Sequence, residues 1–225
     1  MGDSTRVMIE LGRKKPVAVA VAFDWPGWER SGTSEEDALR ILDTYRPRYA
    51  MVAELAGIAD EFSNIGHPVV VERIEGIGMT DFYGLSMRAA GPEEEQMSNA
   101  ACERKIALLR ACWTYFDGVA SRVSAELRKG PRGGGRDRDR IVQHVNNVEI
   151  SDFAMKVGLT TPTEAQQDPD ALRAYRDAFC AAIREYNARG AAARNWTVQF
   201  VIRHSAYHVL DHAWEMEDRD LSSSS

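Results

Sequence analysis

The segment from Arg203 to Asp218 reads RHSAYHVLDHAWEMED and carries three of the five histidines of the chain. His204, His208 and His212 follow one another at steps of four residues, so a helix of 3.6 residues per turn keeps neighbouring members of the series on one side. Apolar residues recur around them at three- and four-residue steps. The segment therefore predicts a helix that packs in a bundle and carries histidines toward its neighbours.

This helix is predicted to run from Trp196 to about Asp218, with Asn195 as its N-cap. A helical wheel gives it one broad apolar face, with His212 inside that face, His208 at its edge and His204 further out. A second apolar stripe lies on the other side and consists of Trp196, Phe200, Tyr207, Leu210 and Trp214. A helix that is apolar on two sides is buried on both, so the second stripe is predicted to dock the N-terminal part of the chain.

Three further helices are predicted between Pro92 and this last helix. Apolar residues at helical steps run from Met97 to Leu127, and the breaker GPRGGG follows. The segments 136–158 (RDRDRIVQHVNNVEISDFAMKVG) and 171–190 (ALRAYRDAFCAAIREYNARG) each end at a glycine, a common residue just after a helix. A polar loop, LTTPTEAQQDPD, separates these two segments.

The N-terminal part shows short β-branched runs instead. They predict strands at Thr5–Leu11, at Pro16–Phe23 and in HPVVVERIEG, residues 67–76. The stretch DWPGWERSGTS, residues 24–34, is dense in Pro, Gly and Ser and is predicted to be a loop.

One helix is predicted between the second and third of these strands. Thr33 or Ser34 is its expected N-cap, acids fill its first turn, and it runs to about Ala56 with a bend near Pro47. After the third strand, TDFYGLSM (residues 80–87) fits either a fourth short strand or an irregular connection.

Together these patterns predict an α+β fold, with a small sheet-and-helix module at residues 1–91, a four-helix bundle at 92–221 and a disordered tail at 222–225. The 225 residues are 44% hydrophobic and 28% charged, which is typical of a soluble globular protein with a sizeable core. The net charge of −6 argues against a general polyanion binder, so no nucleic acid is expected as a partner.

The cysteines and the chain start favour a cytoplasmic location. Cys102, Cys112 and Cys180 form no CxxC pair, and reduced, buried thiols are the expectation. The stretch MGDSTRVMIELGRKK lacks the apolar region of a secretory signal, and no run reaches the ~18 apolar residues that a membrane span needs. No phosphate-binding loop, dinucleotide-binding glycine motif or GxSxG motif suggests another class of enzyme.

The histidine spacing predicts a metal site. Two imidazoles at i and i+4 can reach one ion, whereas the outer two of the three are ~12 Å apart along the helix axis. A third ligand must then come from another helix, and the mid-helix His144 fits better than His67, which precedes a strand. His144, His208 and His212 are the predicted ligands. His204 with His208 is the competing pair, and separate hydrogen-bonded histidines are the plain alternative.

Three neutral imidazoles with an open coordination position suit a catalytic divalent metal, with zinc as the default and nickel, iron and manganese left open. His204 is then a nearby base, a hydrogen-bond donor to a ligand, or a surface histidine. Glu149 could orient a ligand or act as a base, or it could simply pair with an arginine. Four acids of the last helix are expected in solvent or in salt bridges, and one of them could orient a metal-bound ring: Asp211, Glu215, Glu217 and Asp218.

Two motifs resemble the DinB-like four-helix metalloproteins. DRIVQHVNNVE (residues 139–149) is similar to a segment in which a histidine on the second helix is followed five residues later by a glutamate, here His144 and Glu149. HVLDHAWEMEDR (residues 208–219) is similar to the HxxxH motif of the fourth helix. The resemblance covers about residues 92–221 and implies a four-helix bundle with a three-histidine metal site at one end.

The stretch VAVAFDWPGWERSGTSEEDAL (residues 19–39) resembles the HicB-like pattern, in which a strand leads through an acidic Pro-Gly loop to a helix. This resemblance spans residues 5–76 and implies a small sheet against a helix, a module that helps HicB-type antitoxins to neutralise a toxin. The loop residues Trp25 and Trp28 could lie over the mouth of the metal site, form a contact surface, or pack inside.

The DinB-like resemblance implies a divalent-metal-dependent enzyme, either a thiol-dependent S-transferase or a hydrolase, that acts on a small molecule. A low-molecular-weight thiol such as mycothiol is the implied co-substrate, because a bound metal lowers the pKa of a thiol. Glu149 and His204 are the candidate catalytic residues. The alternative is a non-catalytic, regulatory module that binds a protein partner through its HicB-like segment; a homodimer is left open and no membrane partner is expected.

Overall fold

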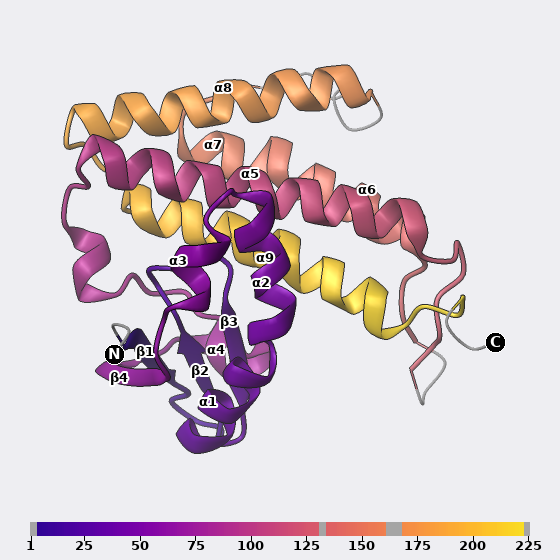
Figure 1. Cartoon of the computed structure of the whole chain (residues 1–225), viewed down its shortest axis with the longest axis horizontal. Coiled ribbons are helices and arrows are strands. Elements are labelled where there is room, and N and C mark those ends of the chain that lie inside the picture. The colour runs from indigo at the N-terminus through magenta and orange to yellow at the C-terminus, as the bar shows by residue number, and fades with distance from the viewer. Residues whose placement is uncertain (1–3, 131–133, 161–167, 223–225) are drawn as a thin grey trace.

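The computed structural model describes residues 4–130, 134–160 and 168–222. The chain has an α+β fold, in which a small four-stranded sheet with short helices lies against a group of long helices (Figure 1). The sheet comes from the N-terminal part and the long helices from the rest, so the predicted α+β class is confirmed. None of the helices in these described ranges is both long and apolar enough to cross a membrane.

The sheet has the strand order β3-β2-β1-β4. β1 (Thr5–Leu11) pairs antiparallel with β2 (Ala18–Val21) and parallel with β4 (Pro68–Glu75), and β2 pairs antiparallel with β3 (Glu29–Gly32). β1 and β2 are buried along most of their length, which is why their sequences are short runs of β-branched and apolar residues. The three predicted strands are confirmed.

The prediction of a loop over residues 24–34 is wrong in its second half, where β3 forms. The turn before β3 is tight because Gly27 adopts a left-handed φ of 89°. β3 lacks an apolar pattern because its first residue, Glu29, is a carboxylic acid that is fully buried. The partner of that carboxylate is Arg203, which lies far away in the sequence, so no local pattern could indicate this strand.

Two helices replace the single bent helix that was predicted, namely α1 (Glu35–Thr44) and α2 (Arg46–Leu55). Ser34 caps α1, since its hydroxyl oxygen accepts from the backbone amide of Asp37 at 3.1 Å. Pro47 stands in the first turn of α2, where its missing amide hydrogen costs no hydrogen bond. The proline therefore begins a new helix and does not bend an existing one.

Two short helices were not predicted. α3 (Ala59–Ser63) follows α2, and α4 (Gly78–Tyr83) occupies half of TDFYGLSM, so a strand there is wrong. Gly84 ends α4 with a left-handed φ of 65°. The aromatic residues that resembled a strand signal lie on the surface instead, with Phe82 71% and Tyr83 69% exposed.

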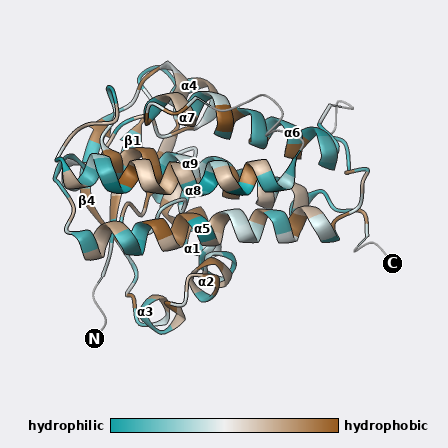
Figure 2. Cartoon of the chain, turned by 90° about the horizontal axis from the view of Figure 1, so that it is seen from above, coloured by the Kyte–Doolittle hydropathy of each residue, from teal (hydrophilic) through white to brown (hydrophobic). Residues whose placement is uncertain are grey.

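The rest of the chain is mainly helical. Its elements are η1 (Gly91–Glu94), α5 (Asn99–Arg122), α6 (Arg138–Val148), the π-helical turn η2 (Glu149–Phe153), α7 (Ala154–Lys156), α8 (Pro169–Ala188) and α9 (Val198–Asp218). The long helices pack against one another, and hydrophilic and hydrophobic residues alternate along them (Figure 2). The four predicted helical segments of this part are confirmed.

The N-cap of α9 differs from the prediction. Thr197 caps this helix, because its hydroxyl oxygen accepts from the backbone amide of Phe200 at 3.1 Å, whereas Asn195 lies in the preceding loop. The two residues have similar capping propensities, so the sequence alone could not separate them.

A π-turn interrupts the helix predicted over residues 136–158. The helix ends where expected, at Gly158, whose φ of 72° is left-handed. A π-turn widens a helix locally and is frequent at functional sites. Most of the predicted loop 159–170 and of the predicted tail 222–225 lies outside the described residues.

One hydrophobic cluster joins the two parts of the chain, from Val7 of β1 to Met216 of α9. Trp25 and Trp28 belong to this cluster and are 4% and 1% exposed. Of the three interpretations of that loop, packing inside is therefore the one observed. The boundary between residues 91 and 92 stays a prediction, and the apolar core extends across it.

The second apolar stripe of α9 docks the N-terminal part, as predicted. The ring of Trp214 meets that of Tyr45 edge-on, with centroids 5.0 Å apart, and the guanidinium of Arg30 lies over both rings. Nearby, Arg203 of α9 and Glu29 of β3 form a fully buried ion pair. These contacts hold α9 against the sheet on one side while the long helices hold it on the other.

Candidate metal centre

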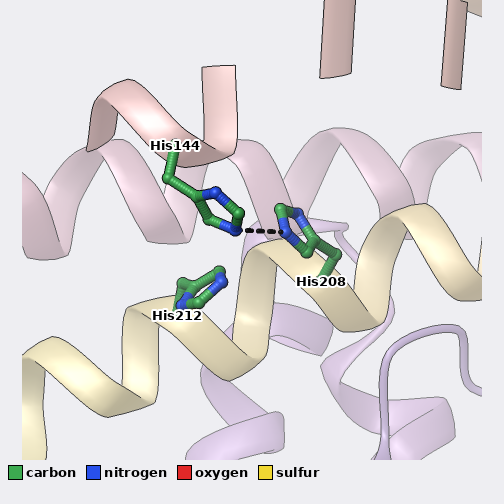
Figure 3. Close-up of side chains that lie close together, drawn as sticks. All are labelled: His144, His208 and His212. Atoms are coloured by element: carbon green, nitrogen blue, oxygen red, sulfur yellow. Dashed lines mark hydrogen bonds between the residues drawn. The ribbon is translucent and has the colours of Figure 1, made fainter. Parts of the chain in front are cut away.

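Three imidazole rings converge between α6 and α9 (Figure 3). α6 supplies His144, and α9 supplies His208 and His212 from successive turns. One nitrogen atom of each ring lies within 4.8 Å of the others. The convergence predicted from the sequence is confirmed, whereas His67 is exposed beside the sheet and takes no part.

The separation of the ring nitrogens suits a shared ion. Nε2 of His144 and Nε2 of His208 are 3.3 Å apart. Imidazole nitrogens bound to one tetrahedral zinc at 2.0–2.1 Å are about 3.3–3.4 Å apart. A direct hydrogen bond between two nitrogens at this distance would be long, since N–H donors usually lie about 2.9–3.0 Å from their acceptors.

The crossing of α6 over α9 places the third ligand. His144 follows the buried Ile141 by one turn and precedes the buried Val145, so the apolar face of α6 that packs in the core also carries the ring to α9. The ring centroid of His144 is 5.2 Å from that of His208 and 5.0 Å from that of His212. Helix packing and ligand placement therefore depend on the same face.

Glu215 holds one of the three rings. Its Oε2 lies 2.8 Å from Nδ1 of His212, so the other ring nitrogen, Nε2, is left for the centre of the cluster. Carboxylates commonly orient metal-binding histidines in this way. Arg219 and Arg136 flank the carboxylate, at 2.8 Å and 3.6 Å, and the pKa of Glu215 is lowered, first by the contact with His212. Glu215 is the ring-orienting acid that the sequence placed among four candidates.

The other three acids of α9 are in salt bridges, as expected. Asp211 pairs with Arg30 at 2.8 Å, Glu217 accepts from Tyr115 and pairs with Arg122, and Asp218 pairs with Arg48.

The surroundings disfavour a proton on two of the three candidate ligands, His208 and His144. Burial lowers the pKa of His208 well below its ordinary value, and the neighbouring His212 and His144 lower it further. Burial also lowers the pKa of His144, with smaller contributions from His212 and Arg136. A metal ion binds to the free lone pair of a neutral imidazole. Because these two rings resist protonation, their nitrogens stay available to an ion.

His204 lies beside the cluster but does not join it. Its ring is enclosed by aromatic rings, with centroids 5.3 Å from Trp196, 5.4 Å from Phe200 and 6.0 Å from Phe153. Burial, together with the nearby charge of Arg203, lowers its pKa to about 3. His204 is half-buried and lies outside the group of converging ring nitrogens, so it is neither a fully exposed histidine nor part of the observed cluster, and at neutral pH its ring is uncharged.

Glu149 takes part in a different contact. It lies in the π-turn, is 2% exposed, and binds Arg176 of α8 at 3.1 Å, while its backbone carbonyl accepts from the hydroxyl of Tyr175. Burial raises its pKa and Arg176 lowers it. The structure does not bring Glu149 to the histidine cluster, so the arginine-paired alternative is the one observed. The five-residue step from His144 turns this side chain toward α8.

A pocket of about 610 Å³ opens over the cluster. The three histidines line it together with Arg136 and Asp211, and its opposite wall comes from α4 and the residues after it: Met79, Tyr83 and Leu85. No sequence pattern indicates this wall, because its residues have no spacing that relates them to the histidines. The N-terminal part therefore shapes the space in front of the candidate ligands.

Comparisons with protein-family models, with curated proteins and with solved structures found no match for this chain. The resemblances to DinB-like and HicB-like proteins therefore stay predictions.

Proposed function

We propose that the chain is a divalent-metal-dependent enzyme of the DinB-like type, a thiol-dependent S-transferase or a hydrolase that acts on a small molecule. The observation that supports this proposal best is the cluster of His144, His208 and His212, with ligand nitrogens within 4.8 Å of one another and an adjoining pocket. Three protein ligands and one open side are typical of catalytic zinc sites, whereas structural zinc sites use four.

The residues present fit a divalent ion. Three imidazoles offer the ligands that zinc prefers, and nickel, iron and manganese remain alternatives. Glu215 fixes the ring of His212, and the buried Nδ1 of His208 has no hydrogen-bond partner in the described part of the chain.

An ion held here would polarise a bound group and lower the pKa of a thiol or a water molecule. The residues of the chain supply the rest of the site. Arg136 places a positive charge beside His212, at 3.5 Å from its Nδ1, and could pair with an anionic group of a substrate. Met79 and Leu85 provide apolar contacts on the opposite wall and reduce the access of water.

A thiol used in the reaction would have to come from another molecule. Cys102, Cys112 and Cys180 are all buried and form no disulfide, as the sequence predicted. Burial raises the pKa of Cys180 to about 11, so this thiol stays protonated and unreactive near neutral pH. The co-substrate that we propose is therefore a separate low-molecular-weight thiol such as mycothiol.

Metal content is the first test. We expect the purified chain to hold about one equivalent of a divalent metal, measured by elemental analysis, and His144→Ala or His208→Ala to lose it while circular dichroism stays unchanged. His67→Ala is the matched control and should keep the metal, because His67 is exposed beside the sheet. A wild-type chain that holds no divalent metal and gains none on titration would contradict the proposal.

The reaction class is tested with cobalt. Cobalt(II) bound by three histidines should give visible absorption bands, and a small thiol such as 2-mercaptoethanol should add an intense near-ultraviolet thiolate-to-cobalt band if thiols reach the open side. A hydrolase without thiol use would show the visible bands but no new band with thiol.

A further inference from the structure

A second pocket, of about 330 Å³, lies behind the histidine cluster and is not used by the proposed reaction. It is bounded on one side by the end of α6, the π-turn and α7, and on the other by the loop that leads into α9. His204 and His208 line both this pocket and the one over the cluster. The volume falls at the small end of the range for ligand-binding pockets, about 300–1,000 Å³.

Two cations face this pocket. The ammonium of Lys156 lies 4.1 Å from the centre of the Trp196 ring, a cation–π contact that positions the charge. Arg194 is exposed, and its side chain makes no hydrogen bond or ion pair with any residue in the described ranges. Among the residues that the structure describes, Asp152 is the one acid that lines the pocket beside them, so this part of the lining carries a net positive charge.

The rest of the lining is mostly apolar. Phe153 is buried, Trp196 is half-buried, and Met87, Val148 and Met155 also line the pocket. A lining of this kind, with a few charged groups at one side, is typical of pockets that bind a small molecule with an apolar body and one charged end.

The backbone on both sides departs from regular structure. Asp152 and Phe153 belong to the π-turn, and Arg194 has a φ of 59°, a left-handed value that non-glycine residues seldom adopt. The backbone hydrogen bonds that join Ala193 and Trp196 in both directions, at 2.8 Å and 3.1 Å, hold Arg194 in this conformation. Such conformations persist where the surroundings fix them and concentrate at binding sites.

We propose that this pocket binds an organic carboxylate with an apolar body, whose charge lies between Lys156 and Arg194 and whose body lies against Trp196 and Phe153. Because His208 is a wall of both pockets, a substrate that carries such a carboxylate would hold its charged end here and its reacting end at the histidine cluster, so the site would select acidic substrates. This second statement rests on the proposed function; the binding of the anion does not.

The test uses the full chain after treatment with a chelator, so that no metal takes part. Isothermal titration calorimetry compares 4-phenylbutyrate with the neutral 4-phenylbutan-1-ol. We expect the carboxylate to bind at least about fivefold more tightly than the alcohol, and Lys156→Gln or Arg194→Gln each to weaken the carboxylate about fivefold, the size of one partly exposed charge contact. The affinity for the alcohol should not change.

Two controls make the outcome specific. Asp152→Asn should tighten binding of the carboxylate, because it removes a negative charge from the lining. Arg189→Gln should leave binding unchanged, because Arg189 is an exposed cation at the C-terminal end of α8 that pairs with Glu185 and does not line the pocket. Equal affinities for acid and alcohol, or an acid affinity that none of the Lys156, Arg194 and Asp152 variants changes, would overturn the proposal.

The same experiment on His144→Ala separates this inference from the proposed function. That variant should lose the metal and still bind 4-phenylbutyrate, since His144 does not line the second pocket. Carboxylate binding in a wild-type chain that takes up no metal would support the anion site and contradict the enzyme proposal. A chain that binds metal but does not prefer the acid would support the enzyme proposal and contradict the anion site.

Discussion

Glu215 Oε2 lies 2.8 Å from Nδ1 of His212, one turn away on α9, and this contact turns the opposite ring nitrogen toward His144 and His208. The contact joins two residues of a single helix, at positions i and i+3, so it forms wherever α9 forms. It requires no rearrangement of α6 when an ion binds.

Replacement of Glu215 by glutamine should weaken metal binding by about 10- to 100-fold, the usual cost of losing such a partner, without unfolding the chain. A competition titration with a zinc indicator measures the change. Asp218→Asn is the matched control on the same helix, because Asp218 pairs with Arg48 and not with a histidine. Equal zinc affinities for Glu215→Gln and the control would show that Glu215 does not act on His212.

Substitution of single histidines can show which of the two HxxxH pairs of α9 binds the metal. His208→Gln should lose the metal, whereas His204→Gln should keep it, because the His204 ring is held among Trp196, Phe200 and Phe153 beside the cluster. Metal content per folded protein is the measurement, and circular dichroism confirms folding. Loss of metal in His204→Gln but retention in His208→Gln would mean that the other pair binds the ion.

Metal removal should lower the stability of the fold, because the ion would tie α6 to α9. At a free zinc concentration 100 times the dissociation constant, binding stabilises the native state by about 2.7 kcal/mol. For a chain of this size the melting temperature should fall by about 5 to 10 °C on chelation. Calorimetry with and without chelator measures the shift. The His144→Ala variant should show no shift, and a shift of the same size in that variant would assign the effect to the chelator.

The buried ion pairs of Arg203 should matter more than any exposed pair. Its guanidinium is 1% exposed and binds Glu29 and Glu93, which are both fully buried. Arg203→Met leaves two buried carboxylates without a counter-charge and should destabilise the chain by about 3 to 5 kcal/mol. Arg184→Met, which removes an exposed pair with Glu103, should cost about 1 kcal/mol or less in the same urea denaturation. Similar costs for the two variants would contradict this difference.

The free energy of unfolding should depend on pH through the titration of Glu29. Burial raises the pKa of Glu29 from 4.5 to about 7 in the folded chain, although Arg203 lowers it. Between these two pH values the folded chain holds a proton that the unfolded chain has released, so this stabilisation is complete below pH 4.5 and is lost as the pH rises through about 7. The destabilisation caused by Glu29→Gln should therefore be larger at pH 5 than at pH 8. Urea denaturation at both pH values measures it, and the opposite order would be inconsistent with a raised pKa.

Local patterns predicted the parts of this fold in which neighbours along the chain decide the structure. The apolar and β-branched runs of β1, β2 and β4 and the helical steps of the four long segments were sufficient to predict these elements. The Ser34 cap was also predictable, because the hydroxyl and the amide that it accepts from are only three residues apart. Where a local rule offered two equivalent residues, as with Asn195 and Thr197 before α9, the sequence could not choose.

Two of the errors share a cause. β3 begins with a buried glutamate whose partner is 174 residues away, and Glu149 turned out to bind Arg176 of another helix and not a ligand of the cluster. In both places a charged side chain is buried because a distant, opposite charge meets it. Periodicity describes which face of an element is apolar, but it contains no information on which buried charges will meet.

The sequence by itself determined that α9 would carry histidines one turn apart and be buried on two sides, and that a third histidine would stand in the middle of another helix. Only the tertiary structure decided that His208 and His212, and not His204, meet His144, and that α4 forms the opposite wall of the pocket. The reason is physical. Backbone hydrogen bonds and side-chain periodicity fix a helix locally, whereas the angle and height at which two helices cross depend on how all their side chains pack together.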